Sequence, residues 1–149
     1  MTTNEQQVSV SREIDAPPEA IFDVLADPRQ HSVIDGSGSV RGVVSGPDRL
    51  ELGSKFGMKM KIGLPYRISS TVVEFDENER IAWAHFGKHR WRYELEPLGD
   101  GSRTRVTETF DYSTARSPWV IEKMGYPRKH PKAMEATLER LADHVEGTT

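Results

Sequence analysis

The stretch that decides the fold is Val8–Leu25, which reads VSVSREIDAPPEAIFDVL. Its first part alternates, with Val8, Val10, Arg12 and Ile14 on one side and polar residues on the other, and this pattern predicts a short strand. The prolines of Asp15-Ala16-Pro17-Pro18 end that strand, and proline is tolerated in the first turn of a helix. The apolar residues that follow have helical spacing. We therefore expect a strand and then a short helix over Pro18–Leu25, with its N-cap near Asp15 or Ala16.

After this helix, Asp27-Pro28 starts a second short helical piece over about Arg29–Val33. Beyond it the apolar residues recur every second residue, which predicts a series of strands. The clearest strand is Lys55–Ile62, because Phe56, Met58, Met60 and Ile62 alternate with lysines and a glycine. The other expected strands are Val40–Val44, Tyr66–Phe75, Arg80–Gly87, His89–Pro97 and Ser102–Tyr112.

The last part of the chain returns to helical spacing. Trp119–Met124 is expected to form one or two helical turns, which Gly125-Tyr126-Pro127 breaks or kinks. Met134, Leu138, Leu141 and Val145 then form one face of an amphipathic helix that Gly147 closes. Helices on one face of an antiparallel sheet define an α+β domain. We expect a single domain over residues 8–147 and a disordered tail over residues 1–7.

Composition excludes several classes of function. The chain has 149 residues and no cysteine, so disulfide frameworks, thiolate nucleophiles and cysteine metal sites are absent. Its 20 basic and 23 acidic residues give a net charge of −3, which does not favour nucleic-acid binding. No stretch approaches the ~20 apolar residues of a membrane span, and the polar N-terminus is not a signal peptide. We expect a cytoplasmic protein without stable membrane insertion.

The sequence resembles the polyketide cyclase/dehydrase and lipid-transport branch of the START-like (SRPBCC) superfamily. The resemblance rests on the order of several stretches: Val8–His31, DGSG at Asp35–Gly38, VVEFDENERIAW at Val72–Trp83, Trp91–Ser113 and MEATLERLADHVE at Met134–Glu146. It implies the helix-grip fold, a curved seven-stranded antiparallel sheet around the long C-terminal helix, with two short helices after the first strand. It also implies an internal cavity. Members of the superfamily include ligand carriers, aromatase/cyclases and quinone-binding accessory proteins, so the fold does not select one function.

Apolar residues that face the helix are the candidate lining of that cavity. Methionines there would make an adaptable wall for an apolar ligand. The alternative is that the same side chains simply fill a core. The predicted ligand-binding residues are Phe56, Met58, Met60, Trp83, Trp91, Tyr93, Phe110, Met134 and Leu138.

Polar residues on the same strand faces are the candidates for chemistry. Period two places Glu108 on the face of Val106 and Phe110, and His85 on the face of Trp83. With the Tyr93 hydroxyl, these groups could orient a ligand's carbonyl or hydroxyl, or transfer protons. They could instead point to the solvated face, and a β-bulge would reverse both assignments. His31 and Asp35 could form a lid contact or be ordinary polar loop residues.

The sequence favours a protein that binds a lipid, polyketide, isoprenoid or quinone as a carrier or sequestering protein. The alternatives are a polyketide aromatase/cyclase that uses His85, Glu108 and Tyr93, and a module that binds a partner protein. No nucleotide, serine-hydrolase or zinc motif occurs, and we expect no metal and no cofactor. The chain could be a monomer or a homodimer.

Overall fold

The computed structural model describes residues 2–4, 7–37, 40–85, 88–113 and 126–146. Its strands are β1 (Thr2–Asn4), β2 (Gln7–Ile14), β3 (Val40–Ser45), β4 (Lys55–Ile62), β5 (Leu64–Asp76), β6 (Arg80–Ala84), β7 (Arg90–Leu98) and β8 (Arg103–Asp111). Its helices are α1 (Pro18–Leu25), the 3-10 turn η1 (Pro28–Gln30), α2 (His31–Ile34) and α4 (Tyr126–Glu146). The helical turns expected over Trp119–Met124 lie outside the described residues.

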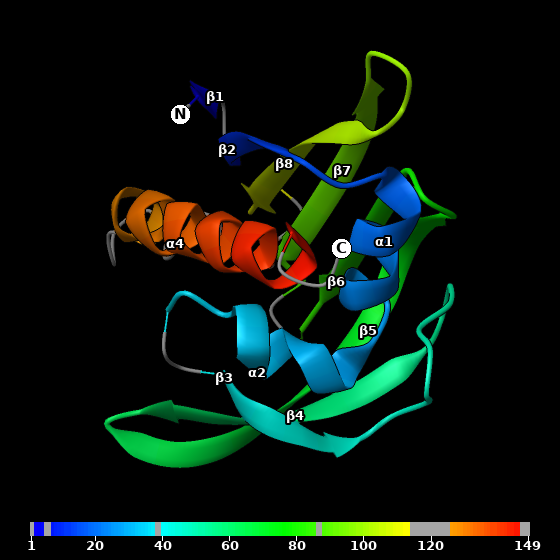
Figure 1. Cartoon of the computed structure of the whole chain (residues 1–149). Coiled ribbons are helices and arrows are strands. Elements are labelled where there is room, and N and C mark those ends of the chain that lie inside the picture. The colour runs from blue at the N-terminus through cyan, green and yellow to red at the C-terminus, as the bar shows by residue number, and fades with distance from the viewer. Residues whose placement is uncertain (1, 5–6, 38–39, 86–87, 114–125, 147–149) are drawn as a thin grey trace.

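One curved antiparallel sheet carries all the described strands, in the order β1-β2-β8-β7-β6-β5-β4-β3. Figure 1 shows α4 lying across the concave side of this sheet, with α1 and α2 beside it. Strands β2–β8 are the predicted seven. This arrangement is the α+β architecture expected from the sequence.

The prediction of a disordered tail over residues 1–7 is wrong for the part of it that the structure describes. Strand β1 pairs with the start of β2, with Thr2 opposite Ser9 and Asn4 opposite Gln7. It adds an eighth strand at the edge of the sheet. Backbone pairing needs no apolar side chains, so the polar composition of this segment gave no signal for it.

Helix α1 begins where the prolines require it. Pro17 is the N-cap, with φ −72° and ψ 158°, and Pro18 follows in the first turn. The N-cap thus lies one residue after Ala16, close to the expected position, and no side chain caps the helix. Proline suits this start because it has no backbone N–H to donate and its φ already matches the first helical turn. The helix buries Ile21, Phe22, Val24 and Leu25.

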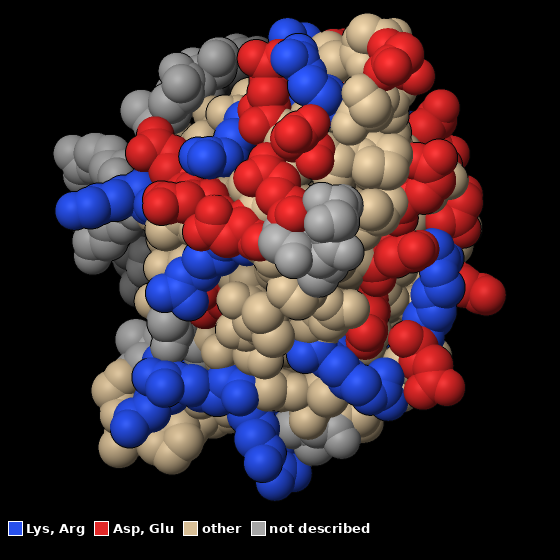
Figure 2. Space-filling model, in the orientation of Figure 1, with Lys and Arg blue, Asp and Glu red and all other residues tan. Residues whose placement is uncertain are grey.

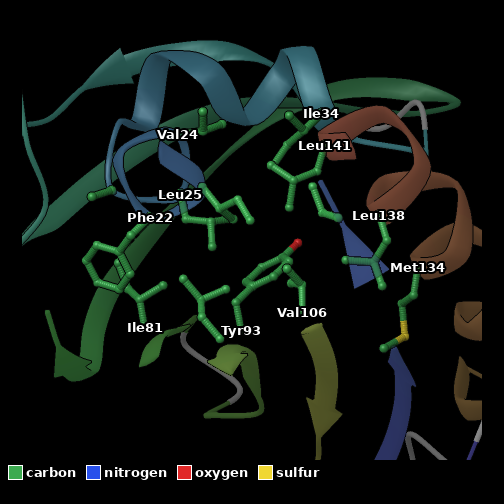
Figure 3. Close-up of a cluster of buried hydrophobic side chains, with 14 of the residues drawn as sticks. Phe22, Val24, Leu25, Ile34, Ile81, Tyr93, Val106, Met134, Leu138 and Leu141 are labelled. Carbon is green, nitrogen blue, oxygen red and sulfur yellow. The ribbon is translucent and has the colours of Figure 1, made fainter. Parts of the chain in front are cut away.

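The core lies between the concave face and the helices. Figure 3 shows the α4 side chains of Met134, Leu138 and Leu141 pointing toward Tyr93 and Val106 of the sheet. Residues from α1 extend the same cluster toward Ile81. Among the described residues no helix is both long enough and apolar enough to span a membrane.

One loop is held tightly against α4. Gly36 lies so close to this helix that a Cβ atom would stand 2.5 Å from the backbone N of Thr137 and 2.7 Å from the carbonyl oxygen of Ala133. The Gly36 N–H also donates to Thr137 Oγ1 at 2.9 Å. This contact fixes the segment after α2 over the sheet.

Candidate functional site

Strand register brings the predicted polar residues to the concave face. Strands β6, β7 and β8 pair without a register shift, so Trp83 lies opposite Trp91, and Tyr93 lies opposite Glu108. The bulge between Val72 and Glu74 of β5 occurs on the other side of β6 and leaves these pairs intact. The inward placement of Glu108 follows directly, and His85 lies two residues beyond Trp83.

A pocket lies on this face between the sheet, α2 and α4. Its cavity volume is about 170 Å³. This is below the ~300 Å³ at which pockets for drug-sized ligands begin, and close to the ~150 Å³ cavity that holds one benzene ring. The enclosed part therefore fits a group of about one ring, and a longer ligand would extend through the opening.

Most of the predicted ligand-binding residues lie on the wall of this pocket. They are Phe56, Met58, Met60, Trp83, Trp91, Tyr93 and Met134. The remaining two predicted residues are not part of the wall. Phe110 is buried and packs on Trp91, with ring centroids 4.7 Å apart, and Leu138 is buried one turn further along α4.

Glu108 and Tyr93 form the polar pair of the pocket. The Tyr93 hydroxyl donates to Glu108 Oε2 at 3.1 Å, and both side chains are buried. Glu108 Oε1 is also buried and has no hydrogen-bond partner among the described residues. An unsatisfied buried carboxyl oxygen is costly, so this atom is the one most in need of a ligand.

The protonation of Glu108 follows from its surroundings. Burial raises the pKa of its carboxyl to about 8, and the nearby Asp35 carboxylate adds to the effect. The Tyr93 hydrogen bond acts in the opposite direction but is weaker. At neutral pH the side chain is therefore mostly a neutral carboxylic acid, which donates as well as accepts.

His85 lies on the wall of the same pocket and is neutral at physiological pH. Its Nδ1 lies 2.7 Å from Ser70 Oγ. Burial lowers the pKa of its imidazole to about 4, and the neighbouring His89 ring, 5.4 Å away, lowers it further. A base this weak does not hold a proton at pH 7, so Glu108 is the stronger candidate for an acid.

His31 is a buried residue of the expected second helical piece, and it is not an exposed polar residue of a loop. It lies in α2, and its Nε2–H donates to the Leu25 carbonyl at 2.9 Å. Its ring stacks on Trp83 at 4.6 Å and meets Phe56 edge-on at 5.4 Å. Burial lowers the pKa of this imidazole. His31 thus forms part of the pocket wall.

The sequence did not predict several other residues of the pocket wall. They include Ile34, Ser37, Val40, Ile68, Ser70, Ala133 and Thr137. Asp35, also on the wall, accepts hydrogen bonds from the backbone N–H groups of Ser37 and Val40. These residues come from α2 and the segment after it, from β3, from β5 and from α4. Only the packing of these elements against one another places the residues on one wall.

The donor set does not suit a metal ion. In the described parts of the chain no group of three or more His, Asp or Glu side chains is arranged to hold one. What the pocket offers is an apolar wall with one carboxyl–phenol pair, which can hydrogen-bond a single polar group of an apolar molecule.

Comparisons with known proteins agree with this architecture. The chain is 46% identical over 142 residues to the uncharacterized protein Rv0088 of Mycobacterium tuberculosis H37Rv, covering 92% of this chain and 63% of that protein. The chain thus spans under two thirds of this relative's length. Among solved structures it is similar to protein NE0264 from Nitrosomonas europaea, with TM-score 0.72, 17% identity and coverage of 99% and 98% of the two chains.

A second solved structure, the Aha1 dimer from Colwellia psychrerythraea, has TM-score 0.63 at 16% identity, covering 94% and 96% of the two chains. At such identities these likenesses concern the fold, and they confirm the helix-grip architecture. The sequence pattern of one family, described as polyketide cyclase / dehydrase and lipid transport, matches residues 5–146. This chain belongs to that family.

Proposed function

We propose that this domain binds a hydrophobic small molecule in the pocket between the sheet and α4, as a carrier or sequestering protein. The observation that carries the proposal is the makeup of the wall. Three methionines, Met58, Met60 and Met134, and the rings of Phe56 and Trp83 surround a space that side chains leave open. Flexible thioethers and aromatic faces suit an irregular apolar ligand. Lipids, polyketides, isoprenoids and quinones are the classes of ligand that we consider.

Burial of apolar surface can supply the free energy of binding without special polar contacts. Burying one methylene group contributes about 0.8 kcal/mol, so several buried methylene groups together offset the cost of association. Because the enclosed volume is about 170 Å³, the part of the ligand that is fully buried is small. Specificity then depends on the carboxyl–phenol pair.

The test is native mass spectrometry of the purified protein, followed by extraction and identification of any retained molecule. Met60→Trp should fill the pocket and abolish retention and the uptake of hydrophobic probes. Leu64→Trp is the matched control. Leu64 lies at the turn of the same β4–β5 hairpin as Met60, but it is 80% exposed and does not line the pocket. A protein that is empty and takes up no probe would contradict the proposal and favour a module that binds a partner protein.

A second candidate function is an aromatase/cyclase, which one observation favours. The pocket holds a carboxylic acid whose raised pKa suits proton donation to a carbonyl during aldol closure. A poly-β-ketone should cyclise faster in the presence of the protein than in buffer alone. Glu108→Gln should slow that reaction strongly, since an amide cannot transfer the proton.

Assembly is a further part of the proposal. The structurally similar Aha1 protein from Colwellia psychrerythraea was solved as a dimer, and this chain is a monomer or a homodimer. Sedimentation velocity of the purified chain distinguishes the two states.

A further inference from the structure

The polar groups of the pocket differ in whether they are already satisfied. Ser70 and His85 bond each other, and the His31 Nε2–H is taken by the Leu25 carbonyl. Thr137 Oγ1 donates to the Ala133 carbonyl and accepts from Gly36. Among the described residues of the wall, only Glu108 keeps a buried oxygen without a partner.

The direction of the missing hydrogen bond can be inferred from the existing one. Tyr93 donates its only hydroxyl hydrogen to Glu108 Oε2, which is therefore the accepting oxygen. Glu108 is 3% exposed, and the described wall contains no Lys or Arg that could balance a negative charge. Its proton then belongs on Oε1, the unpartnered atom, so the group that the pocket offers to a ligand is an O–H donor.

The described wall has two acidic residues and no Lys or Arg. The acidic residue besides Glu108 is Asp35, whose oxygens accept from Ser37 and Val40. Basic side chains lie instead on the outer surface, and many gather in the lower part of Figure 2, where Figure 1 places β3 and β4. A ligand carboxylate would meet Asp35 and Glu108 without a counter-ion, which makes its desolvation costly.

We propose that the pocket selects neutral ligands that carry a carbonyl acceptor on an apolar body, and that Glu108 Oε1–H donates to that carbonyl. The inference rests on the proposed function, because it concerns the ligand of the same pocket. It assigns the ligand's polar end to a ketone, aldehyde or ester and excludes free carboxylic acids. The ring-sized volume places an aryl or compact alkyl carbonyl in the enclosed part.

An ammonium ligand is the main competitor, since Trp83 and Trp91 offer aromatic faces. It would require an ionised Glu108 among apolar groups and would bring several donors, whereas Glu108 Oε1 is the one buried atom of the described wall without a partner. A carbonyl needs a single donor, which is what Oε1–H supplies. The geometry thus favours the neutral carbonyl.

The experiment titrates four probes of nearly equal size into the protein at pH 6.5, followed by protein-observed NMR shifts. The probes are acetophenone, benzoate, benzylamine and ethylbenzene. Acetophenone should bind about tenfold more tightly than ethylbenzene, because it satisfies a buried donor, and benzoate should bind most weakly. Glu108→Gln keeps a donor and should retain the preference, whereas Glu108→Leu should remove it.

A pH series on the wild-type protein gives a readout that does not depend on the folding of a variant, and the same series on Glu108→Gln is its control. In the wild type the preference for acetophenone should fall as pH rises past about 8, where Glu108 loses its proton. In Glu108→Gln it should stay constant over the same range, because the amide does not titrate.

The possible outcomes separate this inference from the proposed function. Equal binding of acetophenone and ethylbenzene would overturn the inference and leave an apolar pocket standing. Tightest binding of benzylamine or benzoate would also overturn it. If no probe shifts pocket resonances, the pocket is not a binding site and the proposed function fails with the inference.

Discussion

Replacing Glu108 with glutamine should make the protein more stable, and more so as the pH rises. In the folded state the carboxyl has a pKa of about 8, against an ordinary value of 4.5, because it is buried. Glutamine has nearly the same shape and keeps an oxygen that accepts from the Tyr93 hydroxyl. The substitution therefore removes the cost of a titratable group and changes the packing little.

The sign and size of the effect follow from proton linkage. Between pH 4.5 and 8 the unfolded chain has lost the Glu108 proton while the folded chain keeps it, so wild-type stability falls as pH rises. The two pKa values differ by about 3.5 pH units, and each unit corresponds to about 1.4 kcal/mol. The free energy of unfolding of the variant minus that of the wild type should be near zero at pH 4. It should approach about 3 kcal/mol at pH 7 and about 5 kcal/mol above pH 9.

Urea denaturation at half-unit steps from pH 4 to pH 9.5, with both proteins in the same buffers, measures this difference. The difference between the two proteins is the useful quantity, because other titrating groups largely cancel in it. For example, His31 is buried and His85 and His89 are partly buried, and desolvation lowers the pKa of each imidazole, so both proteins lose stability on the acid side. A difference that stays flat across the range, or one that shrinks as pH rises, would refute the assignment of a buried neutral carboxyl at Glu108.

Three other predictions follow from packing and burial. Gly36→Ala should lower the free energy of unfolding by about 1–3 kcal/mol, because the new Cβ would stand 2.5 Å from the backbone N of Thr137. Urea denaturation measures this change, and an unchanged midpoint would contradict the close contact. Leu138→Ala should cost about 2–5 kcal/mol, since the side chain is 1% exposed, whereas Leu64→Ala, at 80% exposed, should change stability by less than about 0.5 kcal/mol. Equal costs for these two leucines would refute the placement of α4. The His85 imidazole should remain neutral down to about pH 4, and an NMR titration midpoint above pH 6 would show that it is not buried against the sheet.

Much of the fold could be read from local patterns. The alternation in Lys55–Ile62 predicted the bounds of β4, and the spacing in Pro18–Leu25 predicted those of α1. The expected face of Tyr93 and Glu108 also holds, because side-chain direction in a strand has a period of two residues and no bulge interrupts β7 or β8. Polarity gave no such guide for Thr2–Asn4, where backbone pairing alone makes the strand.

The sequence by itself therefore determined the type of most elements, their order and the inward residues of the central strands, since each of these depends on near neighbours in the chain. Only the tertiary structure decided which inward residues meet. Cross-strand register joins Tyr93 to Glu108, and the docking of α2 stacks His31 on Trp83. The packing of the helices also leaves Phe110 and Leu138 off the pocket wall. These contacts join residues far apart in the chain, and the strand register and helix docking that set their distances and partners are not encoded in any local pattern.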